Sequence, residues 1–168
     1  GILASMKLHE FSDELSSESA APGGGSVSAV AGLLGASLSS MVANLTFGKK
    51  KWLTLFDQMS QISQKSQQLK DELIQLIDAD TDAFKLVMEA YNMPNKTENQ
   101  IIDRTTAIDY AMKEATNIPF KTLKCCRDIM NLTLEAARHG NPKSISDAGV
   151  SGEMANAGAR GAALNIYI

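Results

Sequence analysis

Cysteine and histidine are scarce in this sequence, and neither is placed where it would form a recognisable site. The 168 residues contain two cysteines, the adjacent Cys125 and Cys126, and two histidines, His9 and His139. Adjacent cysteines provide neither a disulfide framework nor the ligand spacing of a zinc site. We therefore expect two reduced helix thiols, no metal site and no Ser-His-Asp arrangement.

A strong charge of one sign and long uninterrupted apolar runs are also missing. Sixteen basic and 19 acidic residues give a net charge of −3, which offers no support for general nucleic-acid binding. Apolar stretches of membrane-spanning length are broken by polar residues, and no signal-peptide pattern leads the chain. We therefore expect a cytoplasmic protein with neither a membrane nor a nucleic-acid partner.

Helical periodicity is the main feature that is present. Apolar residues make up 44% of the chain and charged residues 21%, the balance of a globular domain. Apolar positions recur at steps of three and four, and the alternation typical of strands is nearly absent. The pattern predicts one all-α domain over 1–168, a compact multi-helical bundle or array of about six helices. The expected helices cover 5–17, 27–47, 53–91, 97–115, 119–140 and 147–168.

Capping residues set several of these expected boundaries. Ser26 follows the glycine-rich break at 21–25 and is a suitable N-cap for the second helix. Thr97 and Gln100 have the spacing of a capping box. Pro119 suits the first turn of a new helix, because its missing N–H group would have no partner there.

The second expected helix combines one face of large apolar residues with two rows of small ones. Glycine inside a helix costs about 1 kcal/mol relative to alanine, so a close contact should offset that cost. The last helix is similarly rich in glycine and alanine. We expect these rows to lie in tight contacts between helices or between subunits, in preference to lining a ligand site. The large apolar residues are Val27, Val30, Leu34, Leu38, Met41 and Leu45, and the small rows are Ser28-Gly32-Ala36-Ser40 and Ala31-Gly35-Ser39-Ala43.

An aspartate interrupts the apolar seam of the third expected helix. Steps of three and four lead through Leu73 and Leu76 to Asp80, and the seam resumes at Phe84. Burial raises the pKa of an unpaired carboxyl group, which suits proton transfer near neutral pH. The alternative is a structural carboxylate that pairs with a helix cap or with Arg127. Asp78 and Asp82 lie on a more polar flank, where solvated carboxylates are expected.

Two further segments have less specific patterns. The amides of Gly23, Gly24, Gly25 and Ser26, before a helix, are able to hold an anion or the edge of a polar heterocycle, although a plain connector is equally open. The lysine and preceding strand of a phosphate-binding P-loop are missing. The basic run 49–51 is typical of a solvated helix end, and it would also attract a ligand that carries carboxylates.

Several segments together resemble one family, that of formiminotetrahydrofolate cyclodeaminase. The family includes methenyltetrahydrofolate cyclohydrolases and forms the second domain of the bifunctional formiminotransferase-cyclodeaminase. The similar segments occur in order over nearly the whole chain. They are SAAPGGGSV at 19–27, MVANLTFGKKK at 41–51, DADTDAF at 78–84, RTTAI at 104–108, GN at 140–141, SDAGV at 146–150 and GAALNI at 161–166.

The resemblance implies an all-helical fold, a homodimer, and a tetrahydrofolate derivative as substrate with no other cofactor. Its proposed catalytic acid corresponds to Asp80. For such a substrate, residue type and neighbourhood suggest Asn44 and Asp147 as substrate-binding residues, the glycine-rich loop as the site of the pterin, and Lys49 and Lys50 as partners of its glutamate carboxylates. Family members usually continue with another amphipathic helix, which this sequence lacks.

Two reactions are implied by the resemblance. The favoured one converts 5-formiminotetrahydrofolate to 5,10-methenyltetrahydrofolate and ammonia, and the alternative hydrolyses the methenyl compound to 10-formyltetrahydrofolate. An inactive folate-binding or scaffold bundle is the rival class. A carboxyl group kept inside the apolar seam argues against this rival.

Overall fold

The computed structural model of the chain describes residues 1–47 and 50–167. This part of the chain contains five α-helices, three short 3-10 helices and no strand, which confirms the predicted all-α class. The α-helices are α1 (Leu8–Leu15), α2 (Gly24–Phe47), α3 (Phe56–Tyr91), α4 (Glu98–His139) and α5 (Ile145–Ile166). The 3-10 helices are η1 (Leu3–Ser5), η2 (Lys50–Leu55) and η3 (Pro142–Ser144).

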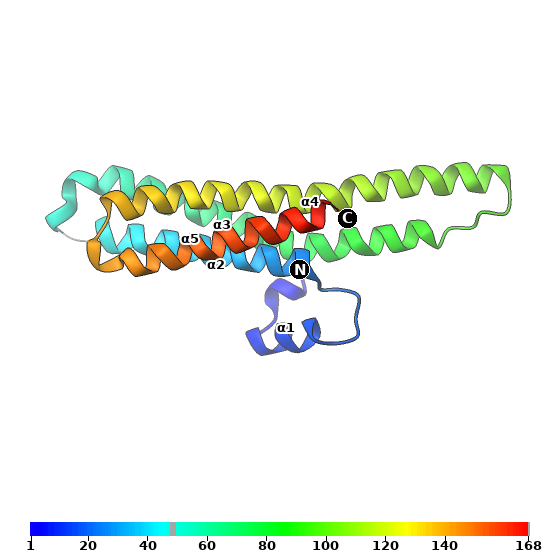
Figure 1. Cartoon of the computed structure of the whole chain (residues 1–168), viewed down its shortest axis with the longest axis horizontal. Helices are drawn as coiled ribbons and strands as arrows, with labels where there is room; N and C mark the ends of the chain where they lie inside the picture. Colours follow the sequence, from blue (N-terminus) through cyan, green and yellow to red (C-terminus); the bar gives the residue numbers. More distant parts are fainter. Residues whose placement is uncertain (48–49, 168) are drawn as a thin grey trace.

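The four long helices form an elongated bundle in which α2 packs against α3, α4 and α5 (Figure 1). Their lengths are unequal, because α3 has 36 residues and α4 has 42, whereas α2 has 24 and α5 has 22. At about 1.5 Å per residue, the α3–α4 hairpin therefore projects well beyond α2 and α5 at one end. The N-terminal end of α2 lies where this projection begins.

The small-residue rows of α2 lie in tight contacts between helices, with α5 and also with α3 and α4. Helices α2 and α5 are antiparallel, with Gly24 beside Asn165 and Gly35 beside Ser151. A Cβ atom on Gly35 would lie 3.0 Å from the carbonyl oxygen of Ser151 and 3.1 Å from the amide nitrogen of Ala155. The hydroxyl group of Ser151 donates to the carbonyl oxygen of Gly35 at 2.7 Å, which fixes the register.

Most of the large apolar residues predicted to share one face of α2 are exposed, whereas Val30 packs against the core. Four of them, which we call the α2 stripe, are between 37% and 47% exposed. Both faces of α2 are apolar. The face that carries the small residues is the buried one, because small side chains let neighbouring helices approach more closely and form more dispersion contacts. The α2 stripe consists of Val27, Leu34, Met41 and Leu45.

By length and composition alone, α2 is long enough and apolar enough to cross a membrane. Its most apolar window has a mean hydropathy of 1.6, and 56% of that window is buried inside the described bundle. A core helix meets the same criteria, because contact with three neighbouring helices demands the same apolar character.

Helix α4 runs unbroken through Pro119, where the sequence predicts the start of a separate helix. The predicted fourth and fifth helices are therefore one. Pro119 is buried together with Ile118 and Thr122. This burial offsets the hydrogen bond that an internal proline removes, because helix stability in a folded domain comes mainly from packing.

Other boundaries agree more closely with the predictions. Helix α3 starts within three residues of the expected position, and its seam residues Met59, Ile62, Leu73 and Leu76 are buried. The capping box at the start of α4 is confirmed, since the side chain of Thr97 accepts a hydrogen bond from the amide of Gln100.

Two predictions near the N-terminus are wrong. Helix α1 is shorter than the expected 5–17, and Leu8 is 82% exposed, while Phe11 and Leu3 pack against the core. Ser26 is the third residue of α2, so it is not an N-cap. Its side chain points to α3, where it has other partners.

Candidate active site

Asp80 lies on α3 directly opposite the first turn of α2. Its Oδ2 atom accepts a hydrogen bond from the Ser26 hydroxyl group at 3.2 Å. The same hydroxyl group lies 2.8 Å from the carbonyl oxygen of Ile77 and 3.4 Å from Oγ1 of Thr81. The carboxyl group of Asp80 is half-buried, while the hydroxyl group that touches it is fully buried.

Gly25 allows this close approach of helix and carboxyl group. A Cβ atom at this position would overlap Oδ1 and Cγ of Asp80. The backbone of Gly25 is in the ordinary helical conformation, so glycine is needed here for space and not for an unusual φ angle. The carboxyl group consequently sits against the N-terminal backbone of α2, whose free amides favour negative charge.

Two opposing effects act on the pKa of Asp80. Burial raises the pKa of this carboxyl group above its ordinary value, and this is the larger effect. Hydrogen bonds from the side chain and the backbone of Ser26 lower it, because they stabilise the ionised form. A carboxyl group in this balance gains and loses a proton closer to neutral pH than a solvated one, as general acid–base chemistry requires.

Asp80 faces a cavity of about 370 Å3 between α2, α3, α4 and α5. A cavity of this size is within the range of small-molecule sites, and its lining is mostly apolar with a few polar groups. Among the described residues that line it, Asp80 is the one with an ionisable side chain. The others are Ala20, Ala21, Gly23, Gly24, Gly25, Phe84, Val87, Met112, Ala115, Thr116 and Asn165.

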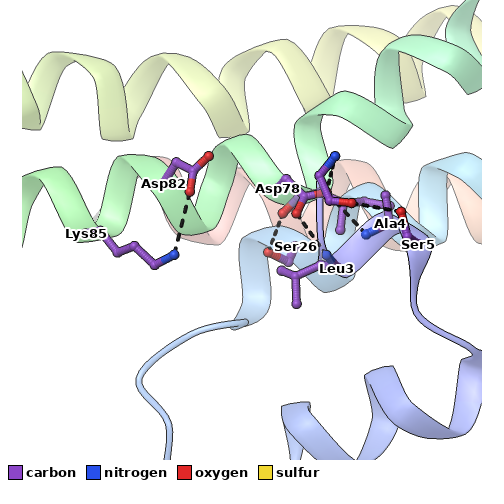
Figure 2. Close-up of polar contacts among 9 residues, drawn as sticks. Leu3, Ala4, Ser5, Ser26, Asp78, Asp82 and Lys85 are labelled. Atoms are coloured by element: carbon purple, nitrogen blue, oxygen red, sulfur yellow. Dashed lines mark hydrogen bonds and ion pairs between the residues drawn. The ribbon is translucent and has the colours of Figure 1, made fainter.

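The neighbouring aspartates, Asp78 and Asp82, have partners of their own, which Figure 2 shows. Asp78 is not solvated as the sequence predicts, because its carboxylate accepts hydrogen bonds from the amides of Leu3 at 2.9 Å and Ala4 at 3.2 Å. It therefore anchors η1 to α3. Asp82 is exposed as expected, and it pairs with Lys85 at 3.7 Å. Neither carboxylate competes with Asp80 for the cavity.

Arg127 is not the partner of Asp80 that one alternative requires. Its side chain is 59% exposed, and its guanidinium group binds the carboxylate of the adjacent Asp128 at 2.7 Å. Asp80 is instead held by Ser26, so a buried ion pair with Arg127 does not explain why a carboxyl group lies in the apolar seam of α3. The two cysteines nearby in sequence are free and buried, in agreement with their expected structural role.

The residues predicted to bind substrate separate into two groups in this structure. Gly23, Gly24, Gly25 and Ser26 lie with Asp80 at the N-terminal end of α2. The second group belongs to the opposite end of α2, about 35 Å away for a 24-residue helix. Within one chain, the described members of the second group, Asn44 and Asp147, do not line the cavity.

The second group contains four predicted residues. Asn44 is exposed near the end of α2, and its side-chain oxygen accepts a hydrogen bond from Ser63 at 2.7 Å. Asp147 is in the first turn of α5, which starts beside the end of α2. Lys49 lies outside the described residues, as does the side chain of Lys50.

Asn165 and Thr116 are cavity residues that the sequence prediction misses. The side-chain amide of Asn165 donates to the carbonyl oxygen of Gly161 at 2.8 Å, so its Oδ1 atom remains available as an acceptor. The segment around Asn165 belongs to the family resemblance, and a polar residue one turn after Gly161 is a usable signal. Thr116 offers no such signal, because polar residues are frequent along that part of α4.

An all-helical bundle with a half-buried carboxyl group in a mostly apolar cavity defines a class of protein suited to acid–base chemistry on a small molecule. Comparison with known proteins identifies the family. Residues 7–168 match the family model described as Formiminotransferase-cyclodeaminase. The chain belongs to this family.

Individual relatives agree with this assignment. A methenyltetrahydrofolate cyclohydrolase of Methylorubrum extorquens is 41% identical over 161 residues, which cover 96% of this chain and 77% of that protein. A formimidoyltransferase-cyclodeaminase of Gallus gallus is 34% identical over 99% of this chain and 31% of its own length. The chain therefore spans about a third of that bifunctional relative.

A solved structure is similar to the whole bundle. The crystal structure of formiminotetrahydrofolate cyclodeaminase from Thermotoga maritima matches with a TM-score of 0.86 and 27% identity. The match covers 97% of this chain and 77% of the Thermotoga chain. Like the family match, it covers all four long helices of the bundle.

Proposed function

We propose that the chain is a folate one-carbon enzyme in which Asp80 transfers protons at the carbon held between N5 and N10 of tetrahydrofolate. The observation that carries this proposal is the single ionisable side chain in the described cavity lining, held against the start of α2. The names of the family and its relatives supply the substrate class. Proton transfer needs no metal or redox cofactor, so the folate is the only small molecule required.

In the favoured reaction, 5-formiminotetrahydrofolate cyclises with loss of ammonia. N10 attacks the formimino carbon, and the proton of N10 ends on the former imino nitrogen. Asp80 then gives its proton to that amino group, the carbon–nitrogen bond breaks and ammonia leaves. The products are the 5,10-methenyl cation and ionised Asp80, which takes up a proton before the next turnover. Burial favours the protonated form in which Asp80 starts the cycle.

A second candidate reaction is methenyltetrahydrofolate hydrolysis, which the 41% identity to the Methylorubrum cyclohydrolase favours. Water attacks the bridging carbon, and one carbon–nitrogen bond opens to give a formyl group. Asp80 would accept one proton of the water and return it to the departing nitrogen, and the second proton of the water is released to solvent as the formyl C=O bond forms. Both reactions pass through a tetrahedral carbon between N5 and N10, so one carboxyl group serves either.

The test compares two aspartate variants on both folate substrates. Asp80→Asn keeps the shape and removes the titrating group, and we expect activity to fall by about 10²–10⁴-fold. Asp82→Asn is the matched control, because Asp82 is exposed two residues away and pairs with Lys85. Formation or loss of the methenyl absorbance measures turnover and identifies the preferred reaction. Near-normal activity of Asp80→Asn would contradict the assignment, and folate binding without wild-type turnover would indicate the inactive bundle.

We also propose a homodimer, because two apolar surfaces of the chain lack a partner among the described residues. One is the α2 stripe. The other is the projecting α3–α4 hairpin, whose large apolar residues are between 40% and 60% exposed. Apolar residues that gather on an exposed surface often mark an interface. The hairpin residues are Phe84, Met88, Tyr91, Ile101, Ile102 and Tyr110.

A dimer formed through the α2 stripe also bears on the two separated groups of predicted substrate residues. A twofold contact in which two copies of α2 run antiparallel brings the end of α2 in one protomer beside the start of α2 in the other. Asn44 and the basic run that follows α2 would then lie near the cavity of the partner. This arrangement supports the proposed role of Lys49 and Lys50 toward the glutamate carboxylates of the substrate.

Light scattering tests the dimer. Leu34→Glu places a charge in the middle of the α2 stripe, and we expect it to give a monomer at micromolar concentration. Lys121→Glu is a suitable control, since it changes charge on an exposed residue of α4 away from both surfaces. A monomeric wild type would contradict the proposal, and a dimeric Leu34→Glu variant would remove the α2 stripe from the interface.

A further inference from the structure

The Ser26 hydroxyl group occupies an unusual position, because it has more acceptors than protons. It carries one proton, and both the carbonyl oxygen of Ile77 at 2.8 Å and Oδ2 of Asp80 at 3.2 Å are within reach. Its oxygen atom also retains lone pairs that are able to accept a hydrogen bond. Ser26 can therefore satisfy the Asp80 carboxyl group in two different ways.

The two ways correspond to the two protonation states of Asp80. When the carboxylate is ionised, Ser26 donates its proton to Oδ2, and the Ser26 oxygen accepts from the hydroxyl group of Thr81, which lies 3.4 Å away. When Asp80 is protonated, Ser26 donates to the carbonyl oxygen of Ile77 and accepts the proton of the carboxyl group. Rotation of one O–H bond separates the two arrangements, so no heavy atom needs to move.

Gly25 fixes the place at which this exchange occurs. Because a Cβ atom at residue 25 would overlap Oδ1 and Cγ of Asp80, any larger residue would displace the carboxyl group from the start of α2. Ser26 is fully buried and part of a regular helix, so its hydroxyl group has a fixed position. The carboxyl group is thus held from two sides by consecutive residues.

We propose that Ser26 is a positioning residue that holds the Asp80 carboxyl group in both protonation states, and that Gly25 provides the space for it. This inference rests on the proposed acid–base role of Asp80. It gives these two residues a task different from the direct contact with the pterin that we expect of the glycine-rich loop.

Charged groups on the surrounding elements do not share this task. On α3, Asp78 binds the amides of Leu3 and Ala4, and Asp82 pairs with Lys85. The first turn of α2 has no acidic residue. The described cavity residues contributed by α4 and α5 are uncharged. The protonation of Asp80 therefore depends on burial and on Ser26.

The central experiment compares Ser26→Ala with Ser39→Ala. Ser39 is a matched control, because it is also fully buried on α2 and its hydroxyl group also contacts α3, through Ser66 at 3.0 Å. A hydrogen bond to a charged group contributes about 1.5–3 kcal/mol, so kcat of Ser26→Ala should fall about 10- to 100-fold. KM should change little, and Ser39→Ala should keep the wild-type kcat.

The pH dependence separates positioning from a general loss of stability. Ser26 favours ionised Asp80, so its removal should raise the pKa of this carboxyl group. The Asp80 limb of the kcat profile should then move to higher pH in Ser26→Ala and stay in place in Ser39→Ala. Carbon NMR of the Asp80 carboxyl group gives the same comparison without any substrate, and therefore also if the proposed folate reaction is wrong.

Two further variants keep the proposal testable if Ser26→Ala does not fold. Ser26→Cys keeps a buried group of similar size but a weaker donor, so it should give an intermediate kcat. Gly25→Ala should lower kcat at least as much as Ser26→Ala while circular dichroism still shows a helical fold. Wild-type kcat and an unshifted Asp80 titration in Ser26→Cys or Ser26→Ala would overturn the positioning role, whereas an active Asp80→Asn would overturn the proposed function itself.

Discussion

Alanine substitutions at two glycines of α5 should change stability in opposite directions. Gly158 faces α2, and a Cβ atom there would lie 2.8 Å from the carbonyl oxygen of Ser28, 2.9 Å from Sγ of Cys126 and 3.0 Å from the amide nitrogen of Gly32. Gly152 lies nearly two turns earlier on the same helix, and a Cβ atom there would meet nothing within 4 Å. Both glycines have helical backbone angles that alanine also adopts.

The magnitude follows from two opposing contributions. Alanine stabilises a helix interior by about 1 kcal/mol relative to glycine, and this gain applies at both positions. At Gly158 the helices must also separate, because two of the three contacts are backbone atoms of α2, and overpacking costs about 1–3 kcal/mol. We therefore expect Gly158→Ala to lower the free energy of unfolding by up to about 2 kcal/mol. Gly152→Ala should raise it by about 0.5–1 kcal/mol.

Urea unfolding followed by circular dichroism measures both variants. With a slope of about 2 kcal/mol per M, the two midpoints should differ by about 1 M. Protein concentration must be equal in all samples, since a dimer makes apparent stability depend on it. If Gly158→Ala is as stable as Gly152→Ala, the close contact between α2 and α5 is absent, and the explanation for the small-residue rows fails.

Three further predictions concern charge and chemistry. Because burial raises the pKa of Asp80, wild-type stability should fall as pH rises from the ordinary carboxyl value of 3.8 through the raised pKa. Urea midpoints of Asp80→Asn should not show this fall. Burial raises the pKa of Cys125 to about 12 and that of Cys126 to about 11, so both thiols should react with a disulfide reagent at pH 8 only after unfolding. Replacing Lys49 and Lys50 by Gln should raise KM more for polyglutamylated folate than for monoglutamate. Equal effects on the two substrates would mean that these lysines belong to a solvated helix end and do not bind the glutamate carboxylates.

Much of the fold could be predicted because α3 has one clear apolar seam. Large residues at steps of three and four face the core, so the buried positions of this helix follow from periodicity. The interruption of the same seam singles out Asp80 by periodicity alone. The family resemblance indicates the same residue from its motif, and the cavity beside Asp80 agrees with both.

The orientation of α2 could not be predicted in this way. Both of its faces are apolar, so periodicity does not distinguish a face of Val27 and Leu34 from one of Gly32 and Gly35. The choice depends on how closely a neighbouring helix approaches, which is set by the small residues of α5 as well as by those of α2. The separation of the predicted substrate residues along α2 likewise depends on helix packing and on subunit contacts.

The continuity of α4 through Pro119 has a consequence for the chemistry of the cavity wall. Proline has no N–H group, so the carbonyl oxygen of Ala115, four residues earlier, lacks its usual helical donor. Ala115 and Asp80 both line the cavity, so α4 contributes to the cavity wall a residue whose carbonyl oxygen lacks that donor. Because the acceptor is main chain, no substitution of the Ala115 side chain removes it. Only a residue with an N–H group at position 119 would do so, and it would strengthen α4 at the same time.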